Sequence, residues 1–177
     1  MTFEELDIKD LDEVIKIENE VFSDPWPYKY FKEDLDNENS IYYALKDEDK
    51  IIGYAGLWFM FENCDLVNIA ISKTYQGQGL GEKLLKLVIR EAILKECEFL
   101  HLEVRTTNTK AYNLYKKLGF IETRTRKDYY GEGQDCLDMV KGLLGLNEED
   151  FSDWKQLRWN SLRDNWWRIK YIKQCGN

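Results

Sequence analysis

Residues 75–81 read YQGQGLG, between the apolar run LVNIAI at 66–71 and the helical pattern EKLLKLVIREAIL at 82–94. Three glycines between a predicted strand and a predicted helix indicate a backbone that a ligand approaches closely. The N-terminus of a helix favours an anion, because its N–H groups are free and its dipole is positive there. The stretch therefore predicts a phosphate-bearing ligand, and an ordinary glycine-rich turn is the alternative.

Two other phosphate-binding patterns do not fit this loop. The dinucleotide fingerprint is GxGxxG, whereas Gly77, Gly79 and Gly81 give GxGxG. The acidic residue that follows the fingerprint about 20 positions later, at a strand end, is also missing. A P-loop closes with Gly-Lys-Ser or Gly-Lys-Thr, which this loop lacks. The remaining interpretation is a pyrophosphate held by consecutive backbone N–H groups.

Around the loop, hydrophobic periodicity predicts alternating strands and helices. Strands are expected at 2–8, 41–46, 51–61, 66–71, 99–105, 120–126 and 136–143, and helices at 11–22, 28–35, 80–95 and 109–118. Asp10 and Glu13 predict a capping box for the first helix, and Asn108 predicts an N-cap for the last. This order predicts one mixed α/β domain over residues 1–146.

The composition limits the kinds of partner. With 44% apolar residues and a net charge of −8, the chain is typical of a globular protein that avoids nucleic acid and favours an amine-bearing partner. An acidic surface that serves only solubility is the alternative. The start, MTFEELDIKD, has no signal-peptide pattern, and the run at 51–61 is too short to span a bilayer. We expect a cytoplasmic protein, without membrane contact, whose four cysteines are free thiols.

The last stretch, 147–177, differs from the rest. It holds four of the six tryptophans, which are Trp154, Trp159, Trp166 and Trp167. Apolar and polar residues alternate there with helical spacing, so we expect an amphipathic helical appendage that packs on the domain or on a partner.

Several motifs together carry a family resemblance. Residues 76–81, QGQGLG, fit the Q/R-x-x-G-x-G/A signature of the GNAT N-acetyltransferases. The stretches NIAI at 68–71, LEVRTTNTKAYNLYKKLGF at 102–120 and RKDYY at 126–130 occur in that family's order. From about residue 2 to 143 the chain resembles the bacterial ribosomal-protein alanine N-acetyltransferases, the RimI type. The resemblance implies the GNAT fold, a mixed and mostly antiparallel central sheet flanked by helices.

The resemblance also implies acetyl-CoA as acetyl donor and no metal. Backbone groups of Ile69, Ala70 and Ile71 would bind the pantetheine arm in the manner of an added strand. The pyrophosphate would lie on the loop, whose implied cofactor-binding residues are Gln76, Gly77, Gln78, Gly79, Leu80, Gly81 and Glu82. Asn108 would contact the coenzyme arm. In place of Gly77, relatives often have an arginine, so one charge of the pyrophosphate site is absent here.

Two residues would carry the chemistry. Strand alternation places His101, Glu103 and Arg105 on one face of 99–105. By resemblance, Glu103 accepts the proton of the amine through water; from spacing alone it is equally a salt-bridged carboxylate. Tyr115, on the apolar stripe of 109–118, is a core residue by pattern. The resemblance places it beside the thioester sulfur, both as a cofactor contact and as proton donor to the leaving thiolate.

The expected substrate is the N-terminal amine of a protein, that of a basic ribosomal protein beginning with alanine. By resemblance, Trp26, Tyr129 and Tyr130 hold this acceptor. Two alternatives remain open at this point: a small-molecule N-acetyltransferase that acts on a polyamine or aminoglycoside, and a non-catalytic acetyl-CoA-binding scaffold. Asp138 also departs from the family pattern, since it interrupts a final strand that is usually apolar.

Overall fold

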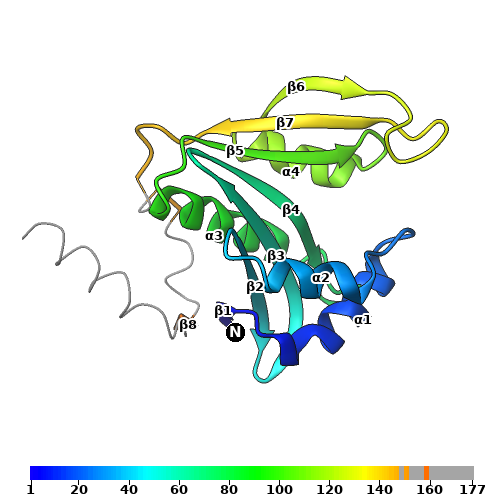
Figure 1. The fold of residues 1–177 in the computed structure, drawn as a ribbon, viewed down its shortest axis with the longest axis vertical. Coiled ribbons are helices and arrows are strands. Elements are labelled where there is room, and N and C mark those ends of the chain that lie inside the picture. Colours follow the sequence, from blue (N-terminus) through cyan, green and yellow to red (C-terminus); the bar gives the residue numbers. More distant parts are fainter. Residues whose placement is uncertain (148–149, 152–157, 160–177) are drawn as a thin grey trace, which may run out of the picture.

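The computed structural model describes residues 1–147, 150–151 and 158–159, which form an α/β fold around one sheet (Figure 1). The strands are β1 (Thr2–Glu5), β2 (Ser40–Asp47), β3 (Lys50–Met60), β4 (Asn63–Ile71), β5 (Phe99–Arg105), β6 (Ile121–Arg126), β7 (Cys136–Gly142) and β8 (Arg158–Trp159). The helices are α1 (Leu11–Val21), α2 (Tyr28–Leu35), α3 (Leu80–Leu94) and α4 (Thr109–Lys117), with 3-10 turns η1 (Ile8–Asp10) and η2 (Lys73–Tyr75).

The sheet has the order β6-β7-β5-β4-β3-β2-β1-β8. Its neighbours are antiparallel except for the pairs β4–β5 and β1–β8, so the expected mixed, mostly antiparallel sheet is confirmed. The fold has two hydrophobic cores, and consecutive residues of β2 pack into different ones. Tyr42 packs with α1 and α2, whereas Tyr43 packs with α3 and α4. Because successive strand residues point to opposite faces, the two helix pairs cover opposite faces of the sheet.

The sheet opens between β4 and β5. These parallel strands pair only over 63–66 and 99–102, and Figure 1 shows them diverging beyond that point. The β3–β4 register shifts between Gly56 and Leu57, which leaves Val67 as the extra residue of a β-bulge. Because the pairing with β5 ends at Leu66, residues 68–71 of β4 pair with β3 alone. Its other backbone edge faces the gap between the two strands.

The first strand and the first helix start differ from the sequence prediction. The strand ends at Glu5 rather than residue 8, because Asp7 and Asp10 form a capping box around η1. The predicted box of Asp10 and Glu13 is wrong, since Asp10 makes no side-chain cap for α1. Glu13 instead accepts a hydrogen bond from the Ile51 amide at 2.9 Å and ties α1 to β3.

The predicted C-terminal helix falls almost wholly outside the described residues. At 158–159 the structure has a strand, β8, parallel to Thr2 and Phe3 of β1, so the helix prediction is wrong for these two positions. Among the described residues, we find no helix with the length and apolar character needed to cross a bilayer.

Candidate active site

The glycine loop joins β4 to α3 in a conformation that requires glycine at two positions. Gly77 has φ +78 and Gly79, the N-cap of α3, has φ +76, both in the left-handed region. A Cβ on either glycine would meet no atom within 4 Å, so backbone conformation and not crowding selects glycine. Gly81 differs, because its Cβ would point inward and lie 3.9 Å from Ile71 and Leu114.

The loop presents a series of free N–H groups. Within the described part of the chain, the amides of residues 77–82 donate no hydrogen bond, and the first helical bond of α3 runs from Lys83 to Gly79 at 3.2 Å. The side chain of Gln76 fixes the loop by donating to the Ile71 carbonyl at 2.9 Å. Lys110 of α4 donates to the Gln76 side chain at 3.3 Å, which brings a cation to the loop. The geometry is that of an anion site.

Other loop side chains make supporting contacts rather than facing a ligand. Gln78 donates to the Thr74 carbonyl at 3.3 Å. Glu82 lies beside two lysines, at 2.5 Å from Lys117 and 3.3 Å from Lys86, and the hydrogen bond from Lys117 lowers its pKa. Leu80 is buried in the core. The predicted cofactor role of residues 76–82 thus depends on their backbone.

At the open edge of β4, the three predicted pantetheine-binding residues are present as extended backbone. Ile69, Ala70 and Ile71 pair with Ala55, Tyr54 and Gly53 of β3 through one edge. The opposite edge faces the gap, although the Ile71 carbonyl is already an acceptor for Gln76. This edge is available to a ligand with amide groups, in the way that a peptide adds to a sheet.

Two further predicted site residues, Asn108 and Tyr115, lie at the start of α4 and within it. Asn108 is its N-cap and accepts from the Ala111 amide at 3.1 Å, so the predicted cap is confirmed. Tyr115 is buried at 6% exposure, with its ring 5.7 Å from that of Phe120. Its hydroxyl has no hydrogen-bond partner among the described residues, and burial raises its pKa to about 12. The group is a protonated donor without an acceptor.

Glu103 lies on the other face of β5, since the exposure of the strand alternates as predicted. Its carboxylate is ion-paired with Arg126 of β6, which also contacts Asp138 of β7 at 2.7 Å. Glu103 and Asp138 are cross-strand partners in the β5–β7 register. Burial and the Glu103 carboxylate raise the pKa of Tyr129. The predicted base is thus one member of a network of two carboxylates, an arginine and a tyrosine.

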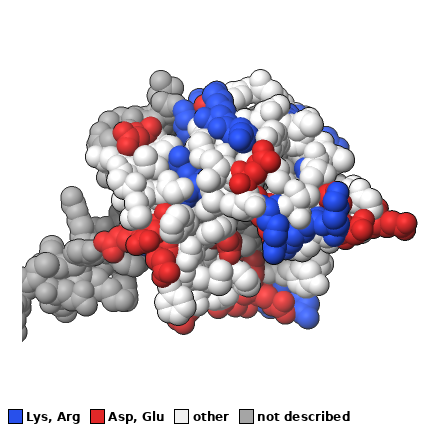
Figure 2. Space-filling view, turned by 90° about the horizontal axis from the view of Figure 1, so that it is seen from above, with Lys and Arg blue, Asp and Glu red and all other residues white. Residues whose placement is uncertain are grey.

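The predicted acceptor residues lie in two loops that meet near β5. The ring centroids of Tyr129 and Tyr130 are 4.8 Å apart. The guanidinium carbon of Arg126 lies 3.8 Å from the centroid of the Tyr129 ring, and that of Arg105 lies 4.1 Å from the centroid of the Tyr130 ring. Arg105 also lies 4.0 Å from Asp24, in the loop between α1 and α2. On the side of the molecule that carries β6 and β7, Figure 2 shows basic and acidic side chains interspersed.

Trp26 is the third predicted acceptor residue, and it is held by a buried carboxylate. Its amide donates to Glu18 at 2.9 Å, and Glu18 is only 1% exposed. The hydroxyl of Tyr54 and the side-chain amide of Asn68, the latter at 3.4 Å, also donate to Glu18. Glu18 therefore links the acceptor loop to β4 directly after its bulge. Glu18 belongs to no sequence motif, and Arg126 opens the RKDYY stretch without a predicted role, because both residues act through partners distant in the sequence.

One described cysteine, Cys136, lies beside the Glu103 network, where its Sγ is 3.7 Å from Arg126 and 3.8 Å from the Tyr130 hydroxyl. Cys64, Cys97 and Cys136 are free and buried, as expected, and Cys175 is outside the described residues. His101 is a partly buried strand residue whose Nε2 lies 3.1 Å from the Asn63 side-chain oxygen. In the described part of the chain, no group of three or more His, Cys, Asp or Glu residues is placed to hold a metal ion.

Comparison with known proteins decides the family. The sequence profile of the Acetyltransferase (GNAT) family matches residues 11–120. The chain is 36% identical over 134 residues to a Bacillus subtilis (strain 168) protein described as a putative ribosomal protein bS18-alanine N-acetyltransferase. That match covers 75% of this chain and 89% of the relative. This chain is a GNAT acetyltransferase.

Two further relatives agree with this assignment. An N-alpha-acetyltransferase of Sulfurisphaera tokodaii is 30% identical over 151 residues, with 77% of this chain and 89% of the relative covered. The crystal structure of the ribosomal-protein-S18-alanine N-acetyltransferase from Escherichia coli superimposes with a TM-score of 0.77 at 31% identity. The superposition covers 83% of this chain and 96% of the Escherichia coli chain. The GNAT fold and an acetyltransferase activity with acetyl-CoA as donor follow from the family.

Proposed function

We propose that this GNAT acetyltransferase transfers the acetyl group of acetyl-CoA to the N-terminal amine of a protein, namely a basic ribosomal protein that begins with alanine. The divergence of β4 and β5 beyond Leu66 and Leu102 carries this proposal. Free N–H groups and an open strand edge form the donor side, and the network around Glu103 forms the acceptor side. Relatives described as bS18-alanine N-acetyltransferases support the choice of substrate.

On the donor side, the residues present fit the coenzyme. The unpartnered amides of 77–82 suit the pyrophosphate, and the ammonium of Lys110 adds positive charge where Gly77 supplies none. The edge of Ile69–Ile71 suits the amides of the pantetheine arm, and Asn108, at the start of α4, is a further proposed contact of that arm. When bound, acetyl-CoA supplies the thioester carbonyl carbon that the amine attacks.

On the acceptor side, Glu103 removes a proton. An α-amino group has a pKa of about 8, so about a tenth of it is neutral at pH 7. Glu103 accepts the ammonium proton through a water molecule, and the free nitrogen lone pair then forms the new C–N bond. Arg126 and Tyr129 hold the carboxylate in place during this step. An N–H of the β4 edge polarises the carbonyl, a contact worth about 3 kcal/mol in other enzymes.

Tyr115 serves the leaving sulfur when the C–S bond breaks. Because its pKa is about 12, it is protonated at neutral pH. A thiol has a pKa of about 8.5, so complete transfer of the tyrosine proton to the thiolate is uphill. We infer that the hydroxyl donates a hydrogen bond to the developing thiolate. The nitrogen loses its second proton after the C–N bond forms, and this proton balances the one that the sulfur gains, while the ammonium proton taken by Glu103 passes to solvent.

The acceptor side distinguishes a protein N-terminus from a polyamine. Arg105 and Arg126 stack on the two tyrosines beside Glu103, and each of these arginines also lies near a carboxylate. A peptide offers backbone amides that can hydrogen-bond beside the reacting amine, whereas a polyamine has no amide groups.

The test is release of free thiol from acetyl-CoA with three acceptors. They are a basic peptide that begins with alanine, the same peptide with a blocked N-terminus and an internal lysine, and spermidine. We expect turnover with the free N-terminus alone. Preference for spermidine would agree with the proposed acetyl-CoA site but would contradict the proposed protein substrate. Absence of turnover with all three, together with acetyl-CoA binding by calorimetry, would favour the non-catalytic scaffold.

A further inference from the structure

One face of the sheet next to Glu103 is lined by aligned side chains from three strands. Trp58, Asp65 and His101 are cross-strand partners in β3, β4 and β5. Closer to the β3–β4 turn, Met60, Asn63 and Phe99 form the next row. Residues in register point to the same side of a sheet, and Phe99, His101 and Glu103 alternate along β5. We call these six residues the hairpin face: Trp58, Met60, Asn63, Asp65, Phe99 and His101.

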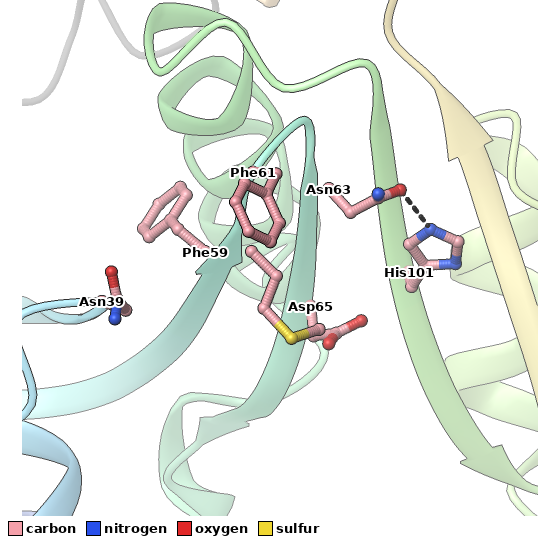
Figure 3. Close-up of a pocket in the computed structure, with 7 residues that line it drawn as sticks. Asn39, Phe59, Phe61, Asn63, Asp65 and His101 are labelled. Carbon is pink, nitrogen blue, oxygen red and sulfur yellow. Dashed lines mark hydrogen bonds between the residues drawn. The ribbon is translucent and has the colours of Figure 1, made fainter.

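The hairpin face is hollow and rich in exposed apolar groups. An open cavity of about 830 Å³ adjoins its end near the β3–β4 turn. It is lined by Asn39, Phe59, Met60, Phe61, Asn63, Asp65 and His101, and Figure 3 labels all of these except Met60. This volume is within the range of about 300–1,000 Å³ for ligand sites. Phe61, in the turn, is 98% exposed, and Met60 is 50% exposed. Apolar side chains gathered in this way mark an interaction surface, in contrast to singly scattered ones.

Polar groups connect this surface to the catalytic carboxylate. The side chains of Asn63 and His101 are hydrogen-bonded at 3.1 Å, and Asp65 lies beside them in Figure 3. Burial raises the pKa of Asp65, His101 opposes the shift, and the charge of Glu103 adds to it. Asp65 and Glu103 therefore feel each other electrostatically. The hairpin face is continuous with the acceptor side of the active site.

We propose that the hairpin face binds the acceptor polypeptide from its third residue onward, in an extended conformation. The proposal rests on the proposed function. A strand rises about 3.3 Å per residue, so the row of His101 lies about 7 Å from Glu103 and the row of Phe99 about 13 Å. An extended peptide spans about 3.3–3.6 Å per residue. The third acceptor residue thus reaches Asp65, and the fifth reaches Met60.

The chemistry of the face selects this occupant. Asp65 attracts a basic side chain, in agreement with the net charge of −8 and a basic acceptor. Met60 and Trp58 offer adaptable and aromatic contacts to an apolar one. The cavity opens at the exposed turn of Phe61, so a polymer can run off the end of the sheet. The surface therefore suits a chain that continues beyond the acetylated residue.

The experiment compares two acceptors that share their first two residues, Ala-Arg. One is the dipeptide amide, and the other is an octapeptide with lysine at position 3 and leucine at position 5. Met60→Ser and Asp65→Asn are tested singly, with Ile8→Ser as control, because Ile8 is 45% exposed and lies at the other end of the sheet. Thermal melting verifies that each variant is folded.

We expect each face variant to raise the KM of the octapeptide about fivefold to tenfold, with kcat and the KM of acetyl-CoA unchanged. The dipeptide KM should stay within twofold, because the dipeptide ends before the hairpin face, and the control should resemble the wild type with both peptides. An unchanged octapeptide KM, or an equal rise for both peptides, would overturn the proposal. If a face variant converts a dimer of this protein to a monomer and leaves the ratio of the two peptide KM values unchanged, the face would instead bind a second copy of the chain. If the wild-type protein acetylates neither peptide, the proposed function fails first.

Discussion

Two groups of residues flank the point where β4 and β5 diverge, and we propose that one binds the acetyl donor and the other the acceptor. The donor side offers backbone: free amides at 77–82 and the open edge of β4. The acceptor side offers charged side chains, with Glu103 and Asp138 sharing Arg126. The difference teaches that the donor side is set by a few local residues, whereas the acceptor side depends on the register of three strands. Substitutions on the two sides should therefore change different kinetic constants.

The largest expected effect is on the acceptor side. Glu103→Gln should lower kcat/KM for a peptide about 10²- to 10⁴-fold at pH 7, because a general base is lost. The acetyl-CoA KM should stay the same, since Glu103 faces away from α4. As the pH rises through the amine pKa of about 8, more amine is neutral without help. The deficit should thus narrow by pH 9.5, as measured by thiol release.

The matched control is Glu122→Gln, which alters an exposed carboxylate of β6 that pairs with Tyr112 and Lys116. It should leave the rate within twofold. A Glu103→Gln deficit that stays constant from pH 7 to 9.5 would show that the carboxylate positions the substrate and does not accept the proton.

Tyr115→Phe tests the donor side at the leaving sulfur. A hydrogen bond to a charged group contributes about 1.5–3 kcal/mol, so kcat should fall roughly 10- to 150-fold. The acetyl-CoA KM should change little. The wild-type hydroxyl has no partner among the described residues, so the variant should melt no lower than the wild type. A marked loss of stability with unchanged kcat would make Tyr115 a core residue only.

The same variant has a consequence at alkaline pH. Burial raises the Tyr115 pKa to about 12 in the fold, compared with about 10 when unfolded. The folded state therefore keeps this proton between those values while the unfolded chain releases it. The contribution of Tyr115 to the free energy of unfolding should be constant below pH 10 and fall between pH 10 and 12. Tyr115→Phe should make that fall shallower in denaturant titrations, and an identical slope would contradict the burial.

The comparison also explains which features the sequence could predict. The Gly79 turn and the Asn108 cap were predicted because one or two residues determine each. The alternation of β5 was predicted for the same reason. The Arg126–Glu103 pair was not, because it depends on β6 and β5 both flanking β7, and no local pattern encodes that order. Asp138 looked anomalous in an apolar strand until its two arginine partners, Arg124 and Arg126, were seen.

Gly79→Val tests whether donor binding depends on backbone conformation. A β-branched residue in the left-handed region costs about 1–2 kcal/mol, so acetyl-CoA affinity should fall roughly fivefold to thirtyfold by calorimetry. The peptide KM should not change. Gly81→Ala is the control, because its φ is ordinary and its Cβ would make normal contacts at 3.9 Å. Equal losses for both variants would mean that side-chain volume, and not the turn, limits binding.

The smallest effect is expected where the acceptor network has a second carboxylate. Asp138→Asn removes one of the two charges that hold Arg126, leaving Glu103 as its remaining ion-pair partner at this site. A partly exposed ion pair contributes about 0.2–1 kcal/mol, so the peptide KM should change at most about fivefold. Acetyl-CoA affinity should be unaffected, because Asp138 contacts only the acceptor side. A fall in acetyl-CoA affinity would show that the donor side and the acceptor side are coupled through β5. Substitutions on the two sides would then not change separate kinetic constants.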